Sequence, residues 1–108
     1  MSLQPAVRRR RLQRDQQRVL RKLVKRTESL AAKLAGGSPD LPIEVTTASV
    51  VETKARSTPC IQCGGDMDLR HDSATSTARG ILREMTLVCR RCHAPRTLWY
   101  RIAPPAAN

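Results

Sequence analysis

The chain of 108 residues contains no phenylalanine, and Trp99 and Tyr100 are its only aromatic side chains. Large rings supply much of the buried area in small cores, so a core here must be built from aliphatic side chains and methionine. Small domains with so little to bury usually need a disulfide or a metal ion for stability. The composition therefore directs attention to the four cysteines.

Long apolar runs are also missing. No stretch reaches the roughly 18 residues that a membrane-spanning helix needs, and the basic N-terminus lacks the apolar segment of a secretory signal. We therefore expect a cytoplasmic protein without a membrane span, although an Arg-rich, acid-poor start is also typical of transit peptides. Four cysteines in a chain that is not exported favour a metal site over disulfides.

Positive charge is concentrated at one end. The formal net charge is +11, and residues 1–35 hold eleven Arg and Lys against only Asp15 and Glu28, a net of +9. Residues 8–34 show helical periodicity, with an apolar stripe that includes Leu20, Leu23 and Leu30. Gly36 and Gly37 follow as a natural stop. We predict a basic amphipathic helix within residues 1–35 and a linker at residues 36–42.

The remainder has β character. Residues 43–53 are rich in β-branched side chains and predict a strand. Met67 and Leu69 alternate with polar residues in a second short strand, and the polar segment 72–80 predicts a turn. Alternation at residues 81–88 and 96–102 predicts two more strands, the last with Leu98 and Tyr100 on one side. Residues 104–108 are expected to be a tail.

The cysteines form two pairs, Cys60-Ile61-Gln62-Cys63-Gly64 and Cys89-Arg90-Arg91-Cys92-His93. Two thiolates separated by two residues can point to one side of a tight turn, where backbone N–H groups donate to the sulfurs. The strand–turn–strand segment between the pairs is long enough to return the chain to the first pair. The pattern predicts one metal ion, Zn²⁺, on Cys60, Cys63, Cys89 and Cys92.

These two C-x-x-C knuckles, with β pattern on their flanks, resemble the zinc ribbon family over residues 43–103. The resemblance implies two cysteine turns at the tips of β-hairpins that share one structural zinc. It departs at Ile61, where the commoner knuckle has Pro, and at His93, where Gly is usual. Zinc ribbons serve in many processes, so the resemblance implies a scaffold and no single activity. The expected fold class is small α+β, a basic N-terminal helix followed by a zinc-ribbon-like antiparallel β module.

Other uses of the cysteines stay open. A redox pair would require a βαβ context, and haem attachment at Cys89–His93 would leave the first pair unexplained. Iron is a further alternative, because four sulfurs do not distinguish it from zinc. Four cysteines close the coordination shell, whereas catalytic zinc keeps one position open. We therefore expect no enzyme, with His71 and His93 as exposed residues, although His93 adjoins a ligand.

Two functional hypotheses follow. The first is nucleic-acid or ribonucleoprotein binding, with phosphate contacts from the basic helix and the second knuckle. The residues assigned to those contacts are Arg8, Arg9, Arg10, Arg11, Arg14, Arg18, Arg21, Lys22, Lys25, Arg90 and Arg91. The alternative is a protein-docking adaptor that uses the apolar stripe, either on a partner or in self-association. A membrane-surface helix is a third reading, weakened by the lack of aromatic anchors.

Overall fold

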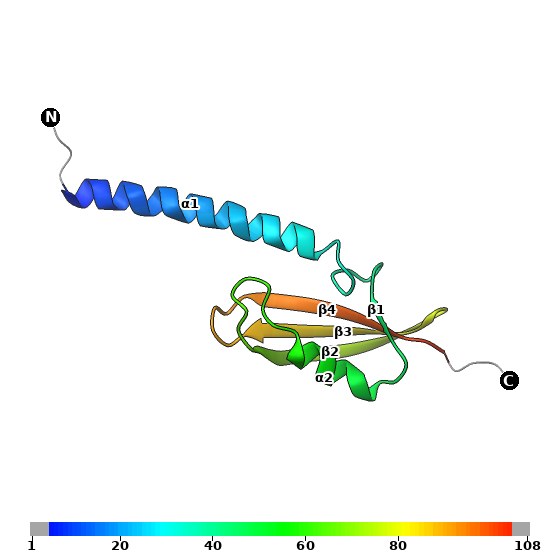
Figure 1. The fold of residues 1–108 in the computed structure, drawn as a ribbon. Helices are drawn as coiled ribbons and strands as arrows, with labels where there is room; N and C mark the ends of the chain where they lie inside the picture. Colours follow the sequence, from blue (N-terminus) through cyan, green and yellow to red (C-terminus); the bar gives the residue numbers. More distant parts are fainter. Residues whose placement is uncertain (1–4, 105–108) are drawn as a thin grey trace.

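The computed structural model describes residues 5–104, and the predicted tail at 104–108 lies almost wholly outside that range. A long N-terminal helix is followed by a four-stranded mixed sheet and one short helix, which confirms the small α+β fold class (Figure 1). The elements in chain order are α1 (Pro5–Ala31), β1 (Ile43–Val45), α2 (Ser49–Ser57), β2 (Met67–Thr77), β3 (Gly80–Cys89) and β4 (Pro95–Ile102).

Helix α1 begins at Pro5, three residues before the predicted start, and ends at Ala31 rather than Leu34. Proline suits the first turn of a helix because its missing N–H would have no partner there. Figure 1 shows α1 running out beyond the sheet, and the molecule measures 82 × 23 × 17 Å. Its radius of gyration is 19.4 Å, against about 13 Å for a compact chain of this length. The helix is therefore an arm, and no helix within residues 5–104 is long and apolar enough to cross a membrane.

The strands lie in the order β1-β4-β3-β2. The β2–β3 and β3–β4 pairs are antiparallel, as expected for successive hairpins. The three residues of β1 add to the outer edge of β4 in the parallel direction, Ile43 opposite Tyr100 and Val45 opposite Ile102. The module is thus an antiparallel meander with one short parallel strand at its edge.

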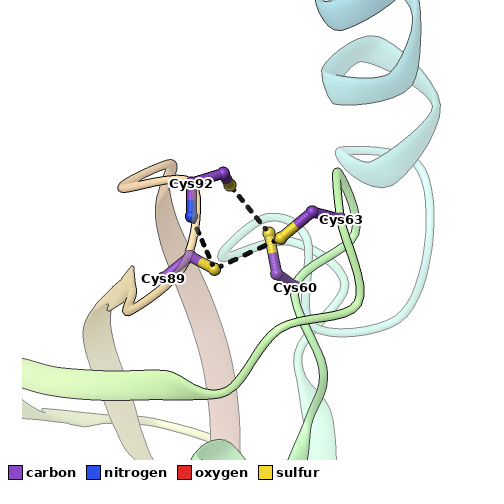
Figure 2. A group of neighbouring side chains, drawn as sticks. All are labelled: Cys60, Cys63, Cys89 and Cys92. Carbon is purple, nitrogen blue, oxygen red and sulfur yellow. Dashed lines mark hydrogen bonds between the residues drawn. The ribbon is translucent and has the colours of Figure 1, made fainter.

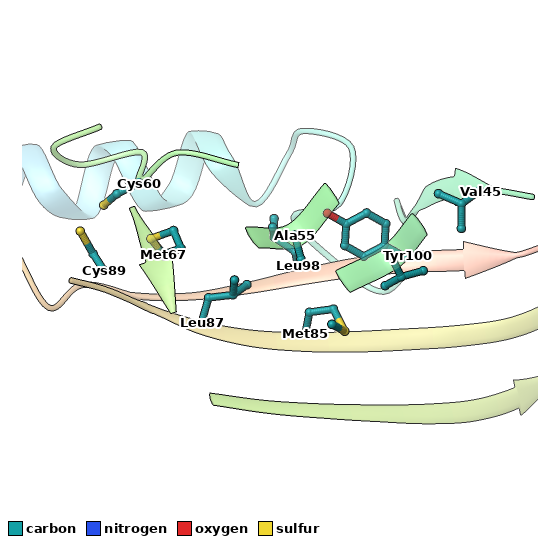
Figure 3. Packing of buried hydrophobic residues seen from close by; sticks show 10 residues of the cluster. Val45, Ala55, Cys60, Met67, Met85, Leu87, Cys89, Leu98 and Tyr100 are labelled. Atoms are coloured by element: carbon teal, nitrogen blue, oxygen red, sulfur yellow. The ribbon is translucent and has the colours of Figure 1, made fainter. Parts of the chain in front are cut away.

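The core lies between α2 and one face of the sheet (Figure 3). Val51 and Ala55, one helical turn apart on α2, are fully buried. They pack in a cluster with Met85, Leu87 and Tyr100 from the two central strands. The cluster continues to Cys60, Met67 and Cys89 at the end of the sheet that carries the cysteines. The core is built from aliphatic side chains, methionine and one tyrosine, as the composition predicts.

The predicted strand at residues 43–53 is wrong beyond its first three residues. Residues Ser49–Ser57 form helix α2 instead. The apolar side chains at Val51 and Ala55 lie on one helical face, and Glu52 and Arg56 form an i,i+4 ion pair at 2.9 Å. Burial of that face against the sheet outweighs the modest strand preference of the β-branched residues.

The predicted turn at residues 72–80 is also wrong in extent. Strand β2 continues to Thr77, which pairs with Gly80, so the turn contains only Ala78 and Arg79. The Thr77 hydroxyl donates to the Gly80 carbonyl at 2.8 Å and closes this turn. The polar residues before it lie on an edge strand and are mostly exposed, so burial imposes no apolar alternation on them.

Candidate metal centre

The two cysteine pairs meet at one end of the sheet, and their four sulfur atoms all lie within 4.8 Å of one another (Figure 2). The Sγ atoms of Cys60 and Cys92 are 3.6 Å apart, and those of Cys63 and Cys89 are 3.4 Å apart. A disulfide would require about 2.05 Å, and all four cysteines are free. A tetrahedron of sulfurs at about 2.3 Å from a central ion has edges of about 3.8 Å. The four ligands predicted from the sequence are therefore placed where they can hold one metal ion.

Two separate segments of the chain carry the cysteine pairs to this end of the sheet. Cys89 is the last residue of β3, and Cys92 follows in the turn that leads into β4. Cys60 and Cys63 lie in the segment between α2 and β2, which α2 holds against the sheet through its buried face. The backbone N–H of Arg90 donates to the carbonyl of Asp66 at 2.9 Å and joins the two turns directly.

The two turns share one backbone pattern. The N–H groups of Gly64 and His93 donate to the carbonyls of Cys60 and Cys89, at 2.7 and 3.0 Å. The first cysteine of each pair donates in turn to the carbonyl five residues on, at 2.9 and 3.0 Å. Gly64 and His93 are both left-handed, with φ of 75° and 63°. Histidine tolerates this region better than most residues, so His93 occupies the place where glycine stands in the first turn.

Backbone donors also point at the sulfurs. The N–H of Gln62 lies 3.4 Å from Cys60 Sγ, and those of Arg91 and Cys92 lie 3.3 and 3.4 Å from Cys89 Sγ. Such bonds disperse thiolate charge and orient metal-binding sulfurs. The N–H of Cys92 is the main reason that the pKa of the Cys89 thiol falls to about 6, which favours its ionisation.

A cluster of four thiolates is unstable without a cation. Although the N–H of Ala94 acts to lower it, the pKa of the Cys92 thiol rises to about 12, because burial and the three neighbouring sulfurs disfavour further ionisation. Removal of all four protons at neutral pH therefore needs a central positive charge, which a divalent ion supplies. The donor set and its surroundings fit such an ion.

Gly65 shapes the space beside the sulfurs. It is buried, and a Cβ at this position would lie 3.0 Å from Cys89 Sγ and 3.3 Å from Cys63 Sγ. A Cβ at the neighbouring Gly64 would meet no atom within 4 Å. The two glycines thus serve different purposes, Gly65 for room beside the cluster and Gly64 for its backbone angle.

The metal centre also contacts helix α1. The Gln62 side chain, between the first two ligands, donates to Glu28 Oε1 at 2.8 Å. Arg96 of β4 donates to the same oxygen at 3.1 Å, and its own side chain is only 14% exposed. The sequence carries no signal for this contact, because Gln62 occupies an unconstrained position of the C-x-x-C motif. Glu28 fastens the last turns of α1 to the module.

The predicted phosphate-binding residues fall into two groups. Those of α1, from Arg8 to Lys25, are all exposed, and none forms an ion pair within residues 5–104. Arg90 and Arg91 lie in the second cysteine turn, where Arg90 bonds Asp68 at 2.6 Å. Arg90 is therefore already committed to a carboxylate, whereas the positive face of α1 is open. His71 and His93 are exposed.

Comparisons with known proteins give no relative. No family model matches the chain, and neither the curated proteins nor the solved structures contain a match.

Proposed function

We propose that this protein is a structural zinc module that carries a nucleic-acid-binding arm. Zinc is the ion that four tetrahedral cysteines most often hold in proteins, and the closed shell suits a structural role rather than catalysis. The site supports the proposal through its four convergent sulfurs and the N–H donors beside them. The ion would close the end of a core that contains one aromatic ring.

One observation carries the arm's role: α1 presents its basic side chains to solvent without acidic partners. Clustered Arg and Lys on one face of a projecting helix are the electrostatic footprint of a phosphate-binding surface. The net charge of +9 over residues 1–35 attracts an anionic polymer, and such binding releases counterions. The only two aromatic residues lie in β4, outside the arm, so the arm offers no stacking platform for single-stranded bases. Binding through the backbone, free or within a ribonucleoprotein, follows from these features.

The metal is identified by native mass spectrometry of protein purified without added metal. We expect the mass of the chain plus one zinc ion. Copurified iron, or a metal-free chain that keeps its fold, would contradict the zinc assignment.

Nucleic-acid binding is measured by fluorescence anisotropy of a labelled duplex and a labelled single strand at several salt concentrations. Each phosphate contact contributes about 0.9 to the slope of log affinity against log salt on B-DNA. Conversion of Arg8–Arg11 and Arg14 to Ala should abolish binding, while Ala preserves the helix. Two matched double variants provide a control. The double variant Arg18→Ala/Lys25→Ala, on the arm, should lower the slope of log affinity against log salt by about 1.8. Arg70→Ala/Arg79→Ala on the module should not change it.

A second function is favoured by the uncovered apolar stripe of α1. Leu23 and Leu30 are 54% and 57% exposed, which is unusual for leucines on one helical face. If the arm docks on protein, Leu23→Asp and Leu30→Asp will destroy function, and neutralisation of the basic face will have little effect. If the arm binds nucleic acid alone, the two substitutions will weaken binding in the anisotropy titration only modestly, through the added negative charge.

A further inference from the structure

Helix α1 exposes its apolar stripe along most of its length. Its exposed members within α1 are Leu12, Val19, Leu20, Leu23, Val24 and Leu30, each between 46% and 61% exposed. The contact with the module lies at the C-terminal end of the helix, around Glu28 and the buried Ala31. The stripe from Leu12 to Leu30 therefore stays open. An amphipathic helix in water gains most of its stability by covering such a face.

The pattern of the stripe is symmetric about its own centre, between Arg21 and Lys22. Residues at equal distances from that point match in type: Leu20 with Leu23, Val19 with Val24, Arg18 with Lys25, Gln16 with Thr27, and Asp15 with Glu28. The match fails at Gln17 and Arg26, which lie on the flanks of the stripe, and farther out at Arg14 and Ser29 and at Gln13 and Leu30. With about 100° between successive residues, Leu20 and Leu23 are about 60° apart and the stripe is centred between them. Along the helix axis, the midpoint between Leu20 and Leu23 is at the same height as the centre of symmetry.

Such a surface is self-complementary. In a two-fold interface, if residue i of one chain contacts residue j of the partner, then residue j of the first chain contacts residue i of the partner. An antiparallel pair of α1 helices centred between Arg21 and Lys22 would have this symmetry. Leu20 would pack on the partner's Leu23 twice, and Gln16 would lie opposite the partner's Thr27 twice, so that polar groups meet polar groups. A parallel pair would instead leave Gln16 against Gln16 and Thr27 against Thr27 in separate layers.

Four of the basic residues nearest the centre of the stripe do not oppose this arrangement. The ridge of Arg18, Lys22 and Lys25 lies on the side of α1 opposite the stripe, as does Arg21 beside it. In an antiparallel pair these groups would point outward on opposite sides, about 20 Å apart for two helices of about 10 Å diameter. That separation exceeds the screening length of about 8 Å at physiological ionic strength.

We propose that the stripe of α1 is a homodimerisation surface that binds a second copy of α1 in the antiparallel direction, with its two-fold axis between Arg21 and Lys22. The dimer would display basic faces on both outer sides. This assignment concerns the apolar side of the helix and does not depend on whether the basic side binds nucleic acid.

The first test is the molar mass of the zinc-loaded full chain by light scattering and sedimentation. We expect about 24 kDa, twice the 12.0 kDa of the monomer, and a mass that persists or rises as salt increases. Leu20→Glu or Leu23→Lys should weaken dimerisation about 100-fold or more, because each change removes two buried leucines from the symmetric interface. Lys22→Glu on the opposite face is the matched control and should remain dimeric. Zinc content and the β signal confirm that every variant is folded.

The orientation is tested by mixing the two monomeric variants. In an antiparallel pair, Glu at position 20 of one chain faces Lys at position 23 of the other, and Leu23 of the first faces Leu20 of the second. The mixture should therefore regain the dimer mass. In a parallel pair, position 20 would face position 20 and position 23 would face position 23, so that each charged residue would lie opposite a leucine. A wild-type protein that stays monomeric at about 100 μM, a concentration at which weak dimers still form, overturns the proposal. So does a dimer that survives both single substitutions, a dimer lost on salt addition, or a mixture that stays monomeric.

Discussion

Gly65→Ala is the sharpest probe of the metal centre, because the structure gives the consequence of adding one methyl group there. The new Cβ would lie 3.0 Å from Cys89 Sγ, whereas ordinary contact begins at 3.4 Å, so the sulfur or the turn must yield by about 0.4 Å. Metal–ligand distances tolerate only about 0.2 Å. Overpacking of this kind costs about 1–3 kcal/mol, which corresponds to zinc affinity weakened about 5- to 150-fold.

Gly64→Ala provides the comparison. Nothing lies within 4 Å of its added Cβ, so its only cost is the left-handed backbone at φ 75°, about 1–2 kcal/mol. Because metal binding and folding are coupled, both variants should bind zinc more weakly in a competition with a chromogenic chelator. Their affinities alone do not separate the two causes, and a geometric readout is needed.

Cobalt(II) in place of zinc supplies that readout. We expect Gly65→Ala to shift the ligand-field bands of the cobalt form, since a ligating sulfur has moved, and Gly64→Ala to leave the band positions unchanged. Gly64→Asn should recover most of the affinity, because asparagine tolerates the left-handed region. A Gly65→Ala protein with the wild-type cobalt spectrum and undiminished zinc affinity would refute the geometry on which the reasoning rests.

Three further outcomes are expected. Chelation should abolish the β-rich circular dichroism and the melting transition of residues 43–103, since structural zinc contributes about 10–16 kcal/mol in small modules; an unchanged melting curve would contradict a metal-dependent fold. Glu28→Ala removes the acceptor shared by Gln62 and Arg96 and should expose residues 32–42 to protease without loss of metal, with Asp15→Ala as the control on the same helix. Burial raises the pKa of Tyr100, so its ionisation at 295 nm should begin above pH 10. Because the unfolded chain releases this proton first, stability should be full below pH 10 and fall as pH rises beyond it; ionisation at the ordinary pH would contradict the buried hydroxyl.

The sequence sufficed for the features that local spacing determines. Helix α1 follows from its periodicity, and the four cysteines converge because each pair makes its own turn. Strands β3 and β4 follow from alternation, since one face of each is buried. Helix α2 could not be anticipated, because Val51 and Ala55 form a helical face only when a sheet is present to cover it.

Features that depend on distant residues were beyond prediction for the same reason. The edge position of β2 frees residues 72–77 from any apolar pattern, so a paired strand has the composition of a loop. The contact of Glu28 with Gln62 and Arg96 joins positions 34 and 68 residues apart, and each of these side chains alone is typical of a surface. The ion pair of Arg90 with Asp68 also joins distant positions, and the assignment of Arg90 to phosphate contacts stays a prediction.

The contact at Glu28 sets the orientation of α1 relative to the metal centre, and a small rotation there moves the far end of the helix. About 35 Å of helix separates Glu28 from Pro5. Within residues 5–104 the contacts of α1 with the module gather at its C-terminal end, where Glu28 binds Gln62 of the first cysteine loop and Arg96 of β4. A rotation of about 10° at this contact would carry the tip through about 6 Å, close to the rise of one helical turn. Adjustments too small to disturb the four cysteine sulfurs are therefore magnified into a change in where the far end of the arm can reach.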